Sequence, residues 1–366
     1  MFSPAVPVSD EFVAAVSEAI TDFLAGQREV LAGIGPDVAP LADLAESFTA
    51  GGKRLRPAFC AWGWVAVAGV PRDAAALVRA AASLDVLHVS ALVHDDVMDA
   101  SDTRRGQPAA HRQFAALHSA RTLRGDAGAF GRGGAILLGD LLLVWSQEMF
   151  RNCGLPAEAI DRAMPVMASV LTEVTTGQFL DILAQARPAL DVRTSPDEVL
   201  AQVRQVLEYK TARYTVIRPL QIGAALAGGS AEVLQLLGRY GSAVGRAFQL
   251  RDDVLGVFGD AEVTGKPAGD DLREGKLTAL LAHALRLAEA DDAVTLADLA
   301  GRRDLTDAEV AHARRIITDS GALATVEAEI AEATAAAVTG LTAAPITDEA
   351  REALTNLAHA SVDRTA

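Results

Sequence analysis

Residues 92–99 read LVHDDVMD, an apolar stretch that ends in three carboxylates, those of Asp95, Asp96 and Asp99. The stretch closes a segment of helical apolar spacing that we expect to cover about residues 72–100. On a helix, positions i and i+4 are neighbours on one face, so Asp95 and Asp99 would aim at one point. Like charges held this close repel, and a cation between them relieves the repulsion. The spacing therefore predicts a site for a hard cation such as Mg2+, although a solvated acidic helix end has the same pattern.

A second acidic pair, Asp252-Asp253, ends the segment FQLRDD (248–253), again inside an apolar helical pattern. Two inward acidic pairs on facing helices of a bundle are typical of a metal site. Di-iron carboxylate proteins are one alternative, but they need two Glu-x-x-His repeats, and Glu309 and His312 supply a single one. A magnesium site is therefore favoured over a di-iron site.

Apolar residues recur at helical spacing along almost all of the 366 residues, without a convincing alternating strand pattern. Half of the residues are hydrophobic but only 5% are aromatic, which favours helix packing over a β-sandwich. No linker or repeat marks a boundary, so we expect one all-α domain over residues 1–366, with 1–8 and 363–366 mobile. The expected helices cover about 9–33, a short segment before Gly51, 54–69, 72–100, 109–123, 129–153, 156–186, 196–228, 230–258, 274–290 and three segments within 305–362.

The composition also excludes several classes of protein. The net charge of −15 argues against nucleic acid as a partner. Cys60 and Cys153 cannot form a disulfide framework, and the first residues have no signal-peptide pattern, so we expect a cytoplasmic protein. The most apolar stretches, 60–70 and 135–145, are shorter than the roughly 18–20 residues of a membrane span, so no span is expected.

Basic residues flank both acidic pairs and indicate which ligand the cations would hold. The segment GGKRLRP (51–57) offers flexible backbone and three cations where a helix should begin, which suits an oxyanion. Its glycine spacing is not that of a Walker-type loop. Each basic residue alone is most often a surface charge, but cations beside metal-bridged carboxylates fit a diphosphate. The other candidates are Arg104, Arg105, Lys210 with Thr211, Lys266 and Lys276.

Six motifs in order make the chain resemble the trans-isoprenyl diphosphate synthases, or polyprenyl synthetase family, and most of all its bacterial geranylgeranyl diphosphate synthases. The motifs are GGKRLRP (51–57), HDDVMDASDTRRG (94–106), GQFLD (177–181), YKTA (209–212), FQLRDD (248–253) and TGKPAGDDLREGK (264–276). The resemblance implies an all-α bundle around a deep apolar cavity, working as a homodimer with Mg2+. It also implies head-to-tail condensation of an allylic diphosphate with isopentenyl diphosphate, with release of pyrophosphate.

The same resemblance implies a role for each matching residue. The metal ligands would be Asp95, Asp96, Asp99, Asp252 and Asp253. The residues matching positions that hold the allylic diphosphate are Arg104, Lys210, Thr211, Gln249, Lys266 and Lys276. Those matching positions that hold isopentenyl diphosphate are Lys53, Arg56, His88 and Arg105. Gln178 and Asp181 match a motif facing the reaction centre, where Thr211 and Gln178 would stabilise the allylic cation.

One position departs from the family pattern. The second aspartate motif often has a third aspartate at its fifth position, where this chain has Gly256, and Asp260 comes too late to share the helical face of Asp252. Two carboxylates can still hold a cation together with water and substrate oxygens, so we expect weakened rather than lost metal binding. A degraded, partly inactive site is the alternative.

The helix carrying Asp95 is expected to set the product length. In shorter-chain members, aromatic residues four or five places before the first aspartate close the cavity. Those places hold Ala91 and Ser90, both small, and Leu87 and Val86 follow one turn further back. Because a helical turn of about 5.4 Å is comparable to an isoprene unit, we expect geranylgeranyl diphosphate, with a longer polyprenyl product as the alternative.

Two other functions share part of the pattern. A class I terpene cyclase would have the bundle and an aspartate motif, but it would leave GGKRLRP (51–57) and Arg105 unexplained. A non-catalytic synthase subunit typically loses an aspartate motif, whereas this chain keeps Asp95, Asp96 and Asp99. Both remain less favoured alternatives.

Overall fold

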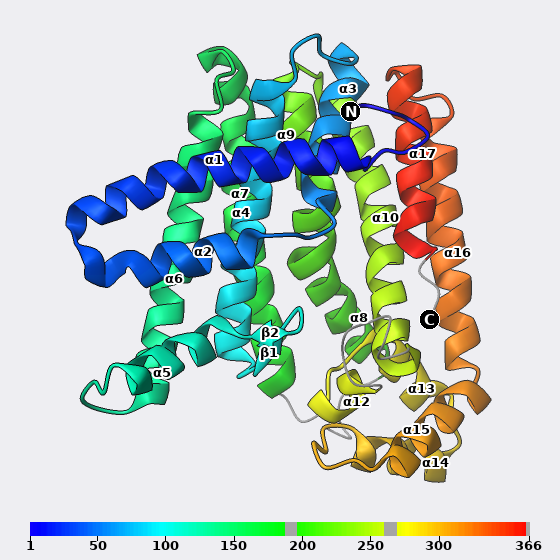
Figure 1. Cartoon of the computed structure of the whole chain (residues 1–366). Helices are drawn as coiled ribbons and strands as arrows, with labels where there is room; N and C mark the ends of the chain where they lie inside the picture. Colours follow the sequence, from blue (N-terminus) through cyan, green and yellow to red (C-terminus); the bar gives the residue numbers. More distant parts are fainter. Residues whose placement is uncertain (187–195, 260–268, 364–366) are drawn as a thin grey trace. The chain divides into compact units, whose positions relative to one another are not determined.

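A computed structural model of the chain describes residues 1–186, 196–259 and 269–363, and helices form almost all of it (Figure 1). This confirms the all-α class predicted from the apolar spacing. Within these ranges the named strands are β1 (Thr103–Arg104) and β2 (Gln107–Pro108), which pair antiparallel. Two residues per strand are too few to produce an alternating pattern, which is why the sequence did not predict them.

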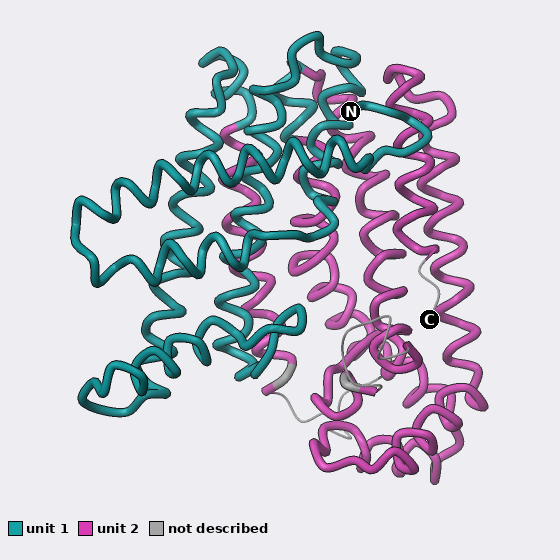
Figure 2. The backbone as a smooth tube through the Cα atoms, in the orientation of Figure 1, with its two compact units in different colours: residues 1–163, 222–228 teal, residues 164–221, 229–366 magenta. Residues whose placement is uncertain are grey.

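The described chain divides into two compact units (Figure 2). Unit 1 comprises Met1–Ala163 and Ile222–Gly228, and unit 2 comprises Met164–Gln221 and Gly229–Ala366. Each unit is described by itself below. The single domain expected over the whole chain stays a prediction.

Unit 1 is organised around the apolar helix α4 (Ala75–Met98), whose residues from Leu77 to Ser90 are almost all buried. Ser9 begins the first helix as expected, because its hydroxyl accepts a hydrogen bond from the Phe12 amide at 3.2 Å. Asp126 caps α6 in the same way through the Ala129 amide at 2.7 Å. The elements are α1 (Asp10–Ile34), η1 (Pro36–Val38), α2 (Ala39–Thr49), α3 (Leu55–Ala68), α4 (Ala75–Met98), β1, β2, α5 (Ala110–Ala120), α6 (Ala127–Arg151) and the start of α7 (Ala157–Ala186).

Unit 2 contains an 11-residue π-helix, η2 (Leu207–Ile217), where the sequence predicted an uninterrupted α-helix. The η2 backbone packs closely against α7, since a Cβ atom at Gly177 would lie 2.6 Å from the backbone nitrogen of Lys210. The remaining elements are α8 (Pro196–Val206), α9 (Arg218–Leu226), which crosses into unit 1, α10 (Ala231–Phe258), α12 (Asp270–Glu274), α13 (Ala279–Leu287), α14 (Ala290–Leu299), α15 (Asp307–Asp319), α16 (Ala322–Leu341) and α17 (Asp348–Val362).

The helix predicted over residues 274–290 is shorter than expected. Gly275 has a left-handed φ of 68° and ends α12, a conformation that favours glycine. Thr278 then starts α13 by accepting a hydrogen bond from the Leu281 amide at 3.2 Å. The chain turns again at Ala288 before α14, which the sequence did not predict.

The first eight residues were expected to be mobile, but they make specific contacts with α1 and α3. The Phe2 ring lies 6.1 Å from the Phe12 ring and 5.9 Å from the Trp62 ring. The Trp62 indole also donates a hydrogen bond of 2.9 Å to the Pro7 carbonyl. Aromatic packing therefore fastens this segment to unit 1.

Two helices are long and apolar enough to cross a membrane by length and composition alone, α4 and α6. In α4, 72% of the most apolar window is buried, as in the core helix of a soluble protein. In α6 the corresponding share is only 28%. The expected absence of a membrane span therefore stays a prediction, and the uncovered surface of α6 needs an explanation.

Candidate active site

One face of α4 carries both an acidic and a basic part of the predicted site. His88, Ala91, Asp95 and Asp99 are partly exposed and lie within about 80° of one another around the helix axis. Ser90 is buried and points away from this face, because its hydroxyl donates a 2.7 Å hydrogen bond to the Gly139 carbonyl on α6. Two further predicted length-setting residues, Leu87 and Val86, are also buried.

Within the first aspartate motif, the two adjacent aspartates have different surroundings. Asp96 is buried and forms an ion pair with Arg104, whose Nε donates to its Oδ1 at 2.9 Å. Burial raises the pKa of Asp96 despite the opposing effect of Arg104. Asp95 is partly exposed, with its Oδ2 at 3.5 Å from Arg104 Nη2. Arg104 therefore holds the buried aspartate and leaves Asp95 and Asp99 on the accessible face.

The hairpin β1–β2 aims Arg104 at α4. Its two-residue turn consists of Arg105 and Gly106, both with positive φ, at 52° and 74°. Such values are those of the tight turns that connect short antiparallel strands. The turn also brings Arg105 over the 51–57 loop, since a Cβ atom at Gly52 would lie 3.4 Å from Arg105 Nη2.

The four residues predicted to hold isopentenyl diphosphate all belong to unit 1, and three of them influence one another electrostatically. Burial, followed by the positive charges of Arg56 and Arg105, lowers the pKa of His88 well below its ordinary value. Lys53 is exposed on the loop that precedes α3. The structure thus places a neutral histidine inside a basic cluster, which suits a multiply charged anion.

In unit 2, Lys210 on η2 forms an ion pair with Asp181 on α7, with Nζ 2.5 Å from Oδ2. Asp181 and Gly177 are one helical turn apart on α7. The η2 backbone therefore packs against Gly177 while Lys210 of η2 pairs with Asp181. Thr211 and Gln178 are half-buried on the same two helices. The ion pair brings Lys210 and Asp181 together, and the roles assigned to these four residues stay predictions.

In the second acidic pair one aspartate is again buried. Asp253 accepts hydrogen bonds from Gln249 Nε2 at 2.9 Å and from the Ala279 amide at 3.3 Å. Burial raises the pKa of Asp253 to about 7, although Lys276 and Gln249 oppose the shift. Asp252 is partly exposed. Lys266, a predicted diphosphate ligand, lies outside the described residues.

The position of the missing third aspartate is filled from elsewhere in unit 2. A Cβ atom at Gly256 would lie only 2.0 Å from Oδ2 of Asp271. Asp271 is buried and raises the pKa of Lys276, against the lowering effect of burial. Glycine at position 256 therefore makes room for a carboxylate that comes from α12.

The donor chemistry of these residues fits Mg2+. Carboxylate oxygens are the ligands Mg2+ prefers, and one oxygen, Oδ2 of Asp96, is buried without a hydrogen-bond partner among the described residues. Residues 1–186, 196–259 and 269–363 hold no group of three or more His, Cys, Asp or Glu side chains placed to hold a metal ion by themselves. An open arrangement is the usual one for Mg2+, which keeps waters and takes substrate phosphate oxygens.

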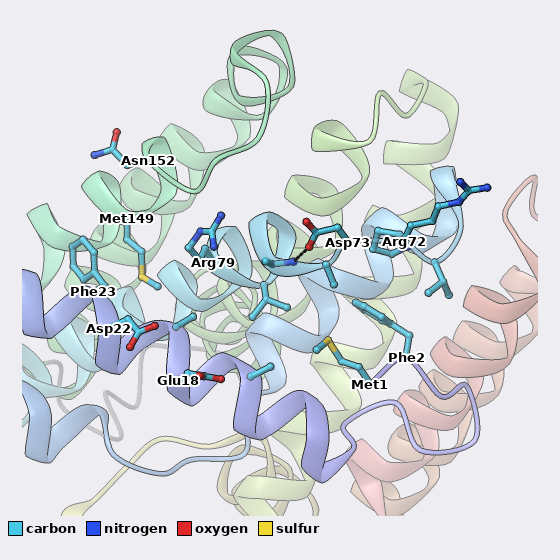
Figure 3. Close-up of a pocket in the computed structure, with 17 residues that line it drawn as sticks. Met1, Phe2, Glu18, Asp22, Phe23, Arg72, Asp73, Arg79, Met149 and Asn152 are labelled. Atoms are coloured by element: carbon cyan, nitrogen blue, oxygen red, sulfur yellow. Dashed lines mark hydrogen bonds between the residues drawn. The ribbon is translucent and has the colours of Figure 1, made fainter.

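A cavity of about 880 Å3 in unit 1 lies at the other end of α4 (Figure 3). Its walls include Glu18 and Asp22 of α1, Arg79 of α4 and Met149 of α6. Residue 79 is about 24 Å along the helix axis from Asp95, so this cavity does not contain the predicted site.

The sequence counted Arg54 among the three cations offered to an oxyanion and missed Asp85, and the structure corrects both expectations. Arg54 and Asp85 are buried and form an ion pair. The only sequence signal was a single carboxylate in the otherwise apolar segment LDVLHV (84–89). Such a residue is seldom buried unless it is paired, so it pointed to a partner without identifying it.

Comparisons with known proteins agree with this geometry. The family model for polyprenyl synthetase matches residues 39–317. A geranylfarnesyl diphosphate synthase of Aeropyrum pernix is 34% identical over 75% of this chain and 78% of that protein. A geranylgeranyl diphosphate synthase of Methanosarcina mazei is 33% identical over 75% and 74%.

A solved structure is similar over nearly the whole chain. It is that of a geranylgeranyl pyrophosphate synthase from Corynebacterium glutamicum complexed with isoprenyl diphosphate and magnesium. The TM-score is 0.90 at 39% identity, covering 97% of this chain and 99% of that one. The chain therefore belongs to the polyprenyl synthetase family of trans-isoprenyl diphosphate synthases. It is a prenyltransferase of the type that elongates prenyl chains.

Proposed function

We propose that the protein joins isopentenyl diphosphate head to tail to an allylic diphosphate, depends on Mg2+ and makes geranylgeranyl diphosphate. The observation that carries this proposal is the face of α4, where His88 lies among arginines, two turns before Asp95 and three before Asp99. A basic cluster binds a diphosphate directly, whereas a carboxylate face binds one through a metal ion. Two diphosphate sites side by side are what a condensation of two diphosphates needs.

The partly exposed aspartates are the best placed metal ligands. Asp95 and Asp99 share one helix face, and Asp252 is the accessible member of its pair. Asp96 and Asp253 are buried and also organise Arg104 and Gln249, while the Oδ2 atom of Asp96, which lacks a hydrogen-bond partner in the described part of the chain, stays available to the metal ion. When bound, Mg2+ neutralises diphosphate oxygens and so assists their departure as a leaving group.

The basic residues then stabilise the transition state. Arg104, Lys210 and Lys276, with Lys266, are assigned to the allylic diphosphate, where negative charge grows as its carbon–oxygen bond breaks. The bonding electron pair leaves with pyrophosphate, and the isopentenyl double bond attacks the resulting allylic cation. Thr211 and Gln178 present oxygen dipoles to this cation. The proton lost from the new intermediate goes to the released pyrophosphate.

The second diphosphate site consists of Lys53, Arg56, His88 and Arg105. The lowered pKa of His88 keeps its ring neutral at pH 7, so the arginines and the lysine supply the charge. The neutral ring can donate one hydrogen bond to a phosphate oxygen. Isopentenyl diphosphate would therefore bind without a metal ion.

The assigned product length rests on Ala91, which lies on the aspartate face one turn before Asp95. A small side chain there leaves room for a growing prenyl chain, whereas Ser90 is tied to α6. Ala91→Phe should shorten the product, as measured by mass. Ser90→Phe should instead lower stability, because its ring would press on α6, and a shortened product from this variant alone would refute the assignment to Ala91.

We also propose a homodimer whose interface includes α6. Leu137 and Val144 are 60% and 61% exposed, and Ile136 beside them is exposed as well. Apolar side chains gathered on one helix usually mark an interaction surface. Leu137→Glu should convert the dimer to a monomer in light scattering, whereas a monomeric wild type, or one bound to lipid vesicles, would refute the dimer.

The proposed location is the cytoplasm, and no nucleic-acid partner is proposed. Both cysteines, Cys60 and Cys153, are buried free thiols, in keeping with a reducing compartment. The net charge of −15 disfavours nucleic-acid binding.

The experiment that tests the function uses purified protein, Mg2+, isopentenyl diphosphate and dimethylallyl, geranyl or farnesyl diphosphate in turn. We expect a linear 20-carbon diphosphate, identified by mass. A longer chain would support the polyprenyl alternative, and a hydrocarbon made without isopentenyl diphosphate would indicate a terpene cyclase. No product with any primer would favour the non-catalytic subunit.

A further inference from the structure

The second cation of GGKRLRP, Arg54, differs from the cations on either side of it. Lys53 is exposed and Arg56 is partly exposed, as ligands of a substrate should be. Arg54 is only 3% exposed. A buried guanidinium needs partners inside the protein, so this residue serves a different purpose from its neighbours.

Arg54 connects the loop to three helices of unit 1. One nitrogen, Nη1, forms an ion pair with Asp85 on α4. The other, Nη2, donates to the Ser17 hydroxyl on α1 at 3.1 Å and to the carbonyl of Thr49, the last residue of α2, at 3.0 Å. The guanidinium therefore fixes the loop relative to α1, α2 and α4 at once.

The backbone of the loop needs such an anchor. Arg54 itself has a left-handed φ of 49°, which is unfavourable for a residue with a side chain. Gly51 and Gly52 also have positive φ, at 78° and 105°, so the loop is built from conformations that ordinary residues avoid. Strained backbone at a functional site persists where the surrounding contacts over-determine it, and the three partners of Arg54 do so.

The partner carboxylate lies close to the substrate-binding residues. Asp85 is 5% exposed and precedes His88 by three residues, so the two side chains lie on neighbouring positions of α4. The Asp85 charge also raises the pKa of Arg105, against the larger lowering effect of burial. Asp85 is thus a counter-charge for two arginines of the basic cluster.

We propose that the Arg54–Asp85 ion pair positions the binding site for the diphosphate of isopentenyl diphosphate. It orients Lys53 and Arg56 toward His88 and Arg105 without touching the substrate. The inference rests on the proposed function, and it makes Arg54 and Asp85 positioning residues. A purely structural ion pair would affect folding and both substrates equally, whereas a positioning pair acts on one substrate.

The test compares Arg54→Met, Asp85→Asn and the double variant with the wild type. Each single variant leaves a buried charge without its partner, so it should lower the Tm and raise the KM for isopentenyl diphosphate about tenfold or more. The KM for the allylic diphosphate should stay within about twofold of the wild type. The double variant removes both charges and should regain Tm while its KM for isopentenyl diphosphate stays high.

Two further variants keep the test decisive if a single variant does not fold. Ser17→Ala removes one hydrogen bond to Arg54 and should raise the same KM about two- to threefold. Arg28→Met, which breaks two exposed ion pairs between α1 and α2, should leave both KM values unchanged. Recovery of the KM together with the Tm in the double variant would overturn the positioning role.

Calorimetry with isopentenyl diphosphate alone separates this inference from the proposed function. The wild type should bind it, and the double variant should bind it about tenfold more weakly. Equal binding by both proteins would overturn the positioning role and leave the function intact. A wild type that binds no isopentenyl diphosphate would overturn the proposed function, and the inference with it.

Discussion

His88 and Asp95 lie two turns apart on one face of α4, yet their surroundings have opposite character. Around His88 the neighbours are arginines, and the ring stays neutral because burial and these charges lower its pKa. Around Asp95 the neighbours are carboxylates, with Arg104 as the cation between Asp95 and Asp96. Under the proposed function, one helix would carry a site that an anion enters directly and a site that an anion enters only with a metal ion.

Under the proposed function, this difference lets one protein keep two similar diphosphates apart. Both substrates carry the same charged group, so charge alone cannot tell them apart. A metal requirement at one position and not at the other can do so. Variants that change one of the two sites at a time should therefore affect one substrate and not the other.

The largest effect is expected from Asp95→Ala. Removal of an accessible carboxylate on the metal face should lower kcat about a thousandfold, because the charge on the departing diphosphate would lose its support. Steady-state kinetics at saturating Mg2+ measure it. The exposed Asp161→Ala serves as the control, and near-normal turnover of Asp95→Ala would contradict the assigned metal site.

The next effect compares Arg56→Ala with Lys210→Ala, and each variant should impair the use of a different substrate. Loss of Arg56 should raise the KM for isopentenyl diphosphate about tenfold to a hundredfold, since charge-assisted hydrogen bonds to a phosphate are lost. Loss of Lys210 should instead act on the allylic substrate and on kcat, because its charge stabilises the leaving group. Equal effects of both variants on both substrates would show that the two sites are not separate.

A smaller effect tests the second acidic region. Gly256→Asp restores the third aspartate of the usual family motif, yet its Cβ would lie 2.0 Å from the Asp271 carboxylate. We expect the variant to lose about 1–3 kcal/mol of unfolding free energy and to gain no activity. Gly340→Asp on α16 is the matched control, since nothing lies within 4 Å of its Cβ position. Higher turnover of Gly256→Asp would mean that the natural site lacks a metal ligand.

The smallest effect is on the pH dependence of stability. The pKa of His88 is lowered on folding, so below about pH 6.5 the unfolded chain binds a proton that the folded chain does not. The contribution of His88 should therefore leave the free energy of unfolding undiminished above pH 6.5. It should lower this free energy progressively as the pH falls toward 5. Denaturant titrations of His88→Gln should show a weaker decrease, and an identical pH profile would contradict the neutral ring.

The sequence was sufficient for the all-α class and for the start of the first helix, because a capping residue such as Ser9 acts locally. The sequence placed Lys210 and the GQFLD segment (177–181) in separate motifs, and the ion pair between Lys210 and Asp181 became visible only in the fold. Where tertiary packing overrides local preference, it failed. The π-helix η2 forms where Gly177 leaves space for the η2 backbone. The spacing of apolar residues does not predict this.

The sequence also did not predict that one aspartate of each pair is buried and the other partly exposed. Asp95 and Asp96 are chemically identical, and only burial and the position of Arg104 distinguish them. The same holds for Gly256. From the sequence it indicates a missing metal ligand, whereas in the structure the Asp271 carboxylate occupies the space beside it. Arg54 and Asp85 are distant in sequence, so their pairing could be recognised only in the folded chain.

The most direct test of the central claim is calorimetry of each substrate with and without Mg2+. The metal-free protein should bind isopentenyl diphosphate with nearly the affinity it has in Mg2+. Binding of the allylic diphosphate, measured in the absence of the second substrate, should require Mg2+. Allylic binding that is equally tight without metal, or isopentenyl diphosphate binding that needs it, would contradict the two-site account.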